Sequence, residues 1–108
     1  MDFKDLKLLE NQLIPVIVQQ FDTKEVLMQA YMNDEAYAKT ISTGDLYFFS
    51  RSRKGLWKKG ETSGHTQDLI ELLIDCDNDC LLALIDQVGP ACHTNHRTCF
   101  YRKVDIYK

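Results

Sequence analysis

Soft metal ligands are concentrated in this sequence where Cys92 and Cys99 enclose two histidines. Thiolate and imidazole groups suit zinc, so this stretch predicts a metal site. The two cysteines lie farther apart than in the C-x₂₋₄-C of zinc ribbons and fingers, which argues against a closed structural site. With Cys76 added, three thiolates would bind zinc and leave a fourth position for water, as in catalytic zinc sites. A neighbouring His93 or His65 could then move a proton.

Three aspartates alternate with other residues in the stretch 75–79, which reads D-C-D-N-D. On an extended chain alternate side chains point the same way, so the carboxylates would share one edge and Cys76 would point away. Carboxylate oxygens suit Mg²⁺ or Ca²⁺, and a cation among them would relieve their repulsion. The alternative is a solvated acidic turn. An EF-hand is excluded, because Cys80 and Asp86 stand where its loop needs Gly and Glu.

The stretch 50–65 is basic and carries glycines, hydroxyl groups and one tryptophan. Its cations suit an anion such as phosphate, and the tryptophan could stack on a ring. The alternative is a solvated basic loop. Because neither G-x-x-x-x-G-K-[ST] nor G-x-G-x-x-G occurs, no ordinary nucleotide-binding fold is indicated. The candidate substrate-binding residues here are Arg51, Arg53, Trp57, Lys58, Lys59, Ser63 and His65.

The cellular compartment bears on how the four cysteines are read. The opening stretch 1–13 is acidic and mixed, which is typical of neither a signal peptide nor a transit peptide, so we expect a cytoplasmic protein. Cytosolic thiols stay reduced, so the cysteines favour metal binding or catalysis over disulfides. The alternative is that they are small buried hydrophobic residues.

Length and composition predict a single globular domain, 1–108. The chain has 108 residues, of which 44% are hydrophobic and 27% charged. The formal net charge of −3 excludes a strongly basic nucleic-acid binder. The longest apolar run, Leu81–Ile85, is far shorter than the ~20 residues of a membrane span, so no membrane partner is expected. Because so short a chain buries a thin core, it has reason to bind a metal or a partner subunit.

The hydrophobic pattern predicts an α+β fold, a strand-rich small domain with about two helices. One short helix would begin at Asp2, and a second, 34–42, would be capped by Asn33 and ended by Gly44. The stretch 51–67 is expected to be a binding loop. Strands are expected at 13–21, 26–32, 46–50, 69–76, 81–88 and 100–106, with hairpins at 13–32 and 69–88. The Leu-rich runs of the second hairpin could also be helical.

Three motifs follow one another along the chain. They read S-R-S-R-x-x-L-W-x-K-G-E-T-S-G-H from Ser50, D-C-D-x-D from Asp75, and A-C-H-T-x-x-x-T-C-F-Y from Ala91. This ordered set resembles the phosphoribosyl-AMP cyclohydrolase family of histidine biosynthesis. The likeness runs from about Val16 to Tyr101, and three motifs in the same order make a chance match improbable.

The resemblance implies a hydrolase that opens the purine ring of phosphoribosyl-AMP with water, breaking the N1–C6 bond. It implies Zn²⁺ and Mg²⁺ as cofactors and an intertwined homodimer as the assembly. Zinc lowers the pKa of bound water towards ~7, and we assign delivery of a proton to N1 to His93. By this resemblance the metal ligands are Asp75, Asp77 and Asp79 for magnesium, and Cys92 and Cys99 for zinc, with Cys76 supplied by the second chain.

Two positions depart from the family pattern, and two other functions compete with it. Asn95 replaces a glycine, but Asn tolerates a left-handed backbone well, so we expect the turn to survive. Cys80 has no counterpart in the motif and is left out of the site. One rival is a structural-zinc interaction module in which all four cysteines close the site. The other is a zinc hydrolase that acts on another purine or a pterin.

Overall fold

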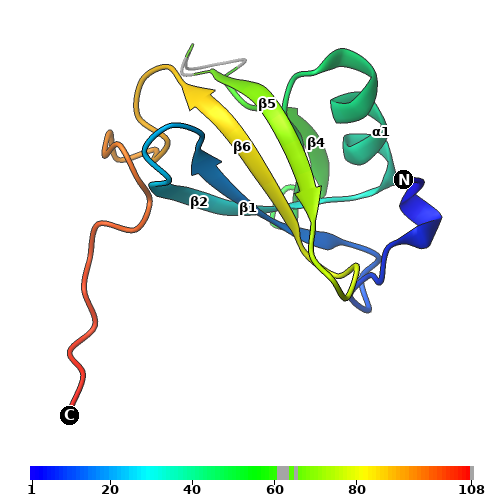
Figure 1. The fold of residues 1–108 in the computed structure, drawn as a ribbon, viewed down its shortest axis with the longest axis horizontal. Coiled ribbons are helices and arrows are strands. Elements are labelled where there is room, and N and C mark those ends of the chain that lie inside the picture. The colour runs from blue at the N-terminus through cyan, green and yellow to red at the C-terminus, as the bar shows by residue number, and fades with distance from the viewer. Residues whose placement is uncertain (61–63, 65, 108) are drawn as a thin grey trace.

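The computed structural model describes residues 1–60, 64 and 66–107, and its main feature is a four-stranded sheet (Figure 1). The strands follow the order β2-β1-β6-β5, with bounds Val26–Met32, Ile14–Gln20, Leu81–Gln87 and Gln67–Ile74. A second, two-stranded sheet pairs β3 (Tyr47–Ser50) with β4 (Gly55–Lys58). One α-helix, α1 (Asp34–Thr43), and one 3₁₀ turn, η1 (Phe3–Asp5), complete the described elements. The predicted strand-rich α+β fold is confirmed, with one α-helix where about two were expected.

The large sheet joins the two predicted hairpins. Strands β1 and β2 are antiparallel, as are β5 and β6, and parallel pairing of β1 with β6 aligns Val16 with Leu81. Because β1 and β6 run the same way, the β5–β6 turn lies at the end of the sheet where β1 begins. The chain that follows β6 therefore emerges at the opposite end, beside the β1–β2 turn. This topology separates the acidic motif from the cysteine–histidine motif.

Helix α1 begins and ends as its sequence predicts. The Asn33 side chain accepts a hydrogen bond from the Ala36 amide at 2.9 Å, which satisfies one of the free donors of the first turn. Gly44 ends the helix with a φ of 78°, and its amide donates to Thr40 O. Because the helix has ten residues, it is too short to cross a membrane, and no other described helix could do so.

The two faces of the large sheet differ. Its inner face buries Val16, Ala83 and Ile85 against a core that also contains Phe48 of β3. On its outer face, the strand register aligns apolar side chains in a row across three strands. Ile17 of β1 lies beside Leu82 of β6, and Leu82 lies beside Leu73 of β5. Ile17 and Leu73 remain 36% and 39% exposed, so the outer face is an open apolar surface.

Three predictions about elements were wrong. The stretch 51–67, expected to be loop throughout, contains β4, which pairs with β3 so that Trp57 faces Phe48. The expected strand 100–106 does not form, and this segment runs away from the body of the molecule (Figure 1). The helix expected after Asp2 is a single 3₁₀ turn.

Candidate active site

The loop after β6 holds Cys92 and Cys99 through backbone hydrogen bonds. Cys92 donates its amide to His96 O at 3.2 Å, and Asn95 donates to Cys92 O at 2.9 Å. Asn95 has a φ of 69°, so the expected left-handed turn is present at this position. At the far end of the loop, the Cys99 amide donates to Leu27 O of β2 at 2.7 Å. Hydrogen bonds within the loop therefore fix the backbone at Cys92, and strand β2 fixes it at Cys99.

The two thiols have different environments. Cys92 Sγ and Thr94 Oγ1 are hydrogen-bonded at 2.9 Å. Hydrogen bonds from Thr94, with a smaller contribution from the Cys99 thiol, lower the pKa of Cys92. Partial desolvation and the neighbouring Cys92 raise the pKa of Cys99. Cys92 is therefore the thiol of the pair that ionises first.

Lys59 lies next to this thiol pair. Its Nζ donates to Ala91 O at 2.9 Å, which ties the end of β4 to the cysteine loop. Burial lowers the pKa of Lys59, and the charges of Cys99 and Cys92 act in the opposite direction. A lysine beside cysteines favours the thiolate form, which is the form that binds metals. By contrast, Lys58 forms an exposed ion pair with Asp45 at 3.3 Å.

A cavity of about 520 Å³ opens beside the thiols. Its lining brings together most of the predicted residues from the basic and cysteine motifs. The lining residues are Met28, Arg53, Trp57, Lys59, Pro90, Ala91, Cys92, His93, Asn95 and Cys99. Cavities of ~300–1,000 Å³ with a few polar groups are typical of small-molecule sites. Trp57 packs against Phe48 with ring centroids 5.0 Å apart, so its ring is held in place.

Two of the predicted substrate-binding residues, Arg51 and Lys58, do not line this cavity. The Arg51 guanidinium lies over the ring of Tyr31, 4.1 Å from its centroid. Lys58 is engaged with Asp45, as described above. Ser63 and His65 lie outside the described residues.

Thr94, His96 and Tyr101 were not predicted as site residues. Thr94 Oγ1 lies 2.9 Å from His96 Nδ1, and the His96 ring stacks on Tyr101 with centroids 3.5 Å apart. This chain of contacts ends at the Cys92 thiol. The spacing T-x-H directly after C-H was the available signal, since it places a hydroxyl and a second imidazole close to the first cysteine.

The acidic motif forms a tight turn. The assumption that 75–79 is extended, with its three carboxylates on one edge, was therefore wrong. Asp75 Oδ1 accepts hydrogen bonds from the amides of Asp79 at 2.9 Å and Cys80 at 3.2 Å, and Asn78 is left-handed with a φ of 62°. These hydrogen bonds lower the pKa of Asp75. A hydrogen bond with Asp75 and repulsion from Asp75 and Asp77 raise the pKa of Asp79. The turn therefore concentrates negative charge.

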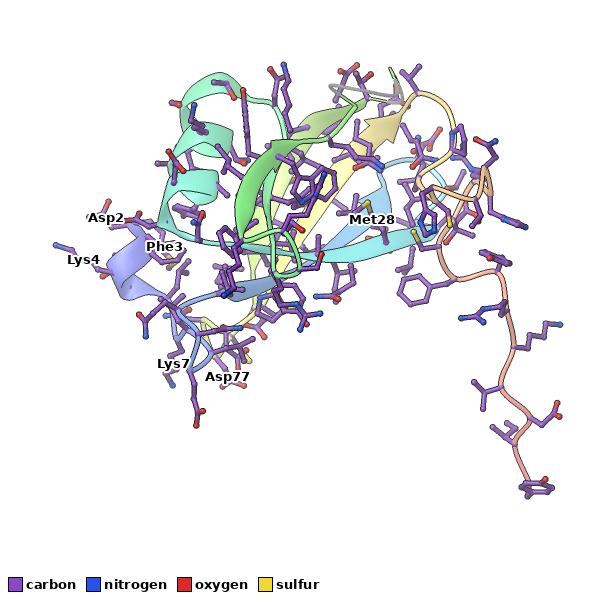
Figure 2. The ribbon with its side chains drawn as sticks, turned by 180° about the vertical axis from the view of Figure 1, so that it is seen from behind. Asp2, Phe3, Lys4, Lys7, Met28 and Asp77 are labelled. Atoms are coloured by element: carbon purple, nitrogen blue, oxygen red, sulfur yellow. The ribbon has the colours of Figure 1, made fainter. Side chains whose placement is uncertain are left out.

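The acidic turn and the cysteine loop lie at opposite ends of β6. Figure 2 shows the separation through Asp77 on the turn and Met28 at the cavity. The seven residues of β6 span about 23 Å at ~3.3 Å per residue. Cys76 therefore cannot join Cys92 and Cys99 within one chain, and a closed four-cysteine site within one chain is excluded. Across residues 1–60, 64 and 66–107, no three histidine, cysteine or acidic residues form a ready metal-binding group.

A larger opening, about 880 Å³, lies between η1 and α1 and shares no lining residue with the cavity beside Cys92 and Cys99. Its walls include Phe3, Tyr37 and Ile41, and the Tyr37 hydroxyl donates to Met1 O at 2.6 Å. The lining has no cysteine or histidine. It therefore offers none of the chemistry found at the smaller cavity.

Comparison with known proteins points to one family. Residues 28–101 match the family model described as phosphoribosyl-AMP cyclohydrolase. A phosphoribosyl-AMP cyclohydrolase from Cereibacter sphaeroides is 64% identical over 91 residues, 84% of this chain and 76% of the relative. Proteins of the same name from Paracoccus denitrificans and Methanoregula boonei are 55% and 58% identical over 103 and 100 residues. These alignments cover 95% and 93% of this chain and 85% and 81% of the relatives.

Proposed function

The chain belongs to the phosphoribosyl-AMP cyclohydrolase family, and we propose that it hydrolyses the N1–C6 bond of phosphoribosyl-AMP with zinc and magnesium. It is an enzyme of this family, a hydrolase of histidine biosynthesis. We further propose that it works in the cytoplasm, since all four cysteines are free thiols. The observation that carries the proposed mechanism is the pair Cys92 and Cys99 beside Lys59, in the wall of a cavity that also contains Trp57.

The donor set at the cavity fits zinc. Cys92 and Cys99 provide two thiolates, and Lys59 stabilises their charge. The third ligand in this proposal is Cys76 of a second chain. Zinc held by three thiolates would lower the pKa of a water molecule towards ~7, which supplies hydroxide at neutral pH.

The cavity residues orient the substrate and move a proton. Trp57, fixed by Phe48, offers a face on which the purine ring can stack. Arg53 provides a forked donor for a phosphate oxygen. His93 donates a proton to N1 as the bond to C6 breaks, so that the leaving nitrogen departs neutral. Arg51 and Lys58 would have to leave Tyr31 and Asp45 to reach a phosphate.

Magnesium is proposed at the acidic turn. Asp75 Oδ1 is engaged by two backbone amides, and a cation would replace the proton that Asp75 and Asp79 share and would be held by these two carboxylates with Asp77. Mg²⁺ usually keeps several waters and is held by one or two carboxylates together with substrate phosphates. A cation here would neutralise the turn and meet the phosphates when the turn of a second chain lies beside the cavity.

The assembly that we propose is a homodimer. It is supported by the length of β6, which keeps Cys76 away from Cys92 and Cys99 of its own chain. It is also supported by the apolar outer face of the large sheet, where Ile17 and Leu73 are more than a third exposed. A two-fold symmetric pair would form two equivalent sites, each with residues from both chains.

The direct test is to incubate the purified protein with phosphoribosyl-AMP and follow the ultraviolet change on ring opening. Dialysis against EDTA should remove magnesium before zinc, because thiolates hold zinc more tightly than carboxylates hold Mg²⁺. Activity should fall on this treatment and return with Mg²⁺ alone. Full activity in Mg²⁺-free buffer would contradict the two-metal proposal, and no turnover by the fully loaded protein would contradict the function.

A further inference from the structure

Residues 100–107 form an extended segment that leaves the body of the molecule and exposes apolar side chains (Figures 1 and 2). Val104 is 87% exposed, Ile106 70% and Tyr107 100%. In the described part of the chain, residues 102–107 make no hydrogen bond or ion pair. Apolar surface of this extent on a folded domain marks an interaction site. We call residues 100–107 the arm.

The outer face of the β5–β6 hairpin is an apolar surface of matching chemistry. Ile70 and Leu73 of β5 are 56% and 39% exposed, while Leu82 and Leu84 of β6 are half-buried on the same face. The inward-facing residues of β5, such as Leu72, pack on the core instead. One face of this hairpin is therefore committed to the core and the other is open.

The proposed dimer brings this open face close to the start of the arm. In that dimer, Cys76 of the second chain approaches Cys92 and Cys99, so the second chain's β5–β6 turn lies beside Cys99. The arm begins at the next residue. Because Tyr101 is stacked on His96, the free part of the arm is residues 102–107, which can span about 20–22 Å when extended, and β6 spans about 23 Å. The free part of the arm is therefore long enough to cover most of the second chain's hairpin.

We propose that the arm of each chain lies along the outer face of the partner's β5–β6 hairpin, so that the two chains exchange arms. Val104 and Ile106 are two residues apart, so on an extended chain both side chains point towards the same surface. Arg102 and Lys103 precede them and would meet the acidic turn 75–79, which complements their charge. Two-fold symmetry makes the exchange reciprocal. This inference rests on the proposed homodimer.

The first test replaces the two apolar arm residues with charged ones. In Val104→Asp/Ile106→Asp, the dimer dissociation constant measured by sedimentation should rise at least about a hundredfold, because four buried apolar side chains are lost per dimer. Both positions are exposed in the single chain, so its circular dichroism spectrum should not change. The matched control is Ile41→Asp on α1, a site 59% exposed, which should leave the dissociation constant within about twofold.

The second test maps where the arm lies. A photoreactive benzophenone at position 104 is introduced into an isotopically labelled chain, which is mixed with unlabelled chains and irradiated. We expect crosslinks between labelled and unlabelled chains at peptides of β5 and β6. If the wild-type protein is a dimer but its crosslinks stay within one chain or fall on other elements, the arm exchange is contradicted. The proposed homodimer is not contradicted by that result. A wild-type protein that sediments as a monomer at catalytic concentrations would overturn both.

Discussion

The two ends of β6 carry the two parts of the proposed site, and they are built on different principles. At the cysteine end, groups distant in sequence meet, since Lys59 donates to Ala91 O and the Cys99 amide to Leu27 O. At the acidic end, the turn is shaped mainly by its own hydrogen bonds, because Asp75 accepts from the amides of Asp79 and Cys80, and the Lys7 amide ties it to the N-terminal segment through Asn78 O at 2.7 Å. One end has a cavity and two of three thiolates. The other has the carboxylates and Cys76, which we proposed as the third zinc ligand.

This difference suggests how the site is divided between chains. A turn that is shaped by its own hydrogen bonds and anchored to the N-terminal segment of its own chain keeps its shape when it is presented to another molecule, so it can act as an inserted element. The cavity depends on contacts from β2, β4 and the loop after β6, so it must be built within one chain. Each chain therefore carries one complete cavity and one complete insert, separated by the length of β6.

The largest effect on activity should come from removing one proposed zinc ligand at either end of β6. Cys76→Ala and Cys92→Ala homodimers should both be nearly inactive, because each lacks a zinc ligand in both sites. When the two variants are unfolded, mixed equally and refolded, about half of the dimers should be mixed. Each mixed dimer has one site with all three thiolates, so activity should recover to roughly one quarter of wild type.

A site contained within one chain would have no intact copy in any such mixture. Absence of recovery, with mixed dimers demonstrated by native mass spectrometry, would place Cys76 outside the shared site. The matched control is Cys80→Ala mixed with Cys92→Ala. Cys80 is left out of the proposed site, so its variant should be active alone, and its equal mixture with Cys92→Ala should keep about half of wild-type activity, the share of sites that retain Cys92.

Substitution of His93 should cause the next largest loss of activity, and it tests the proposed proton transfer at the cavity. His93→Ala should lower kcat by about 10²–10⁴, the usual contribution of a positioned acid–base group. Zinc content should stay near that of wild type, because His93 is not among the proposed ligands. If metal analysis shows that zinc is lost together with activity, His93 is a ligand and its assignment as proton donor is wrong.

Neighbouring lysines give a sharper test of how the cavity end is assembled. Lys59→Gln should lower zinc affinity by about 10–100-fold, the usual effect of removing a group that supports metal ligands. The matched control is Lys58→Gln, which loses only an exposed ion pair with Asp45 and should change zinc affinity little. Competition with a chromogenic chelator measures both. Equal effects of the two substitutions would show that only overall charge matters.

Thr94→Val should have a smaller effect on zinc binding at the cavity. The valine removes the hydrogen bond that lowers the pKa of Cys92, so that pKa should rise and less thiolate should exist at neutral pH. Because zinc binds the thiolate, the midpoint of zinc uptake should move to higher pH. Thr94→Ser keeps the hydroxyl and should stay near wild type. Identical uptake curves for all three proteins would exclude this role for Thr94.

Local sequence signals predicted the parts of the fold that local interactions determine. Asn33 and Gly44 bound α1 as expected, and strand 26–32 has the predicted limits. Strand β4 was missed because its glycine and flanking cations are typical of loops, whereas its pairing with β3 is a non-local interaction. The position of Lys59 beside the thiols likewise depends on that pairing. The W-x-K-G of the family motif includes Lys59 and leaves position 58 open, but it does not predict which lysine contacts the thiols.

Dependence on non-local strand pairing also explains why the conformation of the acidic motif was predicted wrongly. Alternation along D-C-D-N-D assumes an extended chain, and the sequence offers an equally good reason for a turn. Asp75 is a short side chain that can accept from amides four and five residues ahead, and Asn78 tolerates a left-handed backbone. Which of the two occurs is decided by the pairing of β5 with β6, which must close over this stretch.

The smallest effect should come from loosening the turn itself. Asp75→Ala removes the acceptor of two amides, so in metal-free protein at pH 7 and fixed concentration the thermal midpoint should fall by roughly 2–5 °C. Asp77→Ala, the matched control, is expected to change the thermal midpoint less.

This effect should depend on pH. The folded pKa of Asp75 is lowered, so the contribution of Asp75 to stability is complete above its unfolded pKa of about 4 and is lost as pH falls through its folded pKa. The difference in midpoint between wild type and Asp75→Ala should therefore shrink below about pH 4. A difference that persists at low pH would mean that the carboxylate charge does not stabilise the turn.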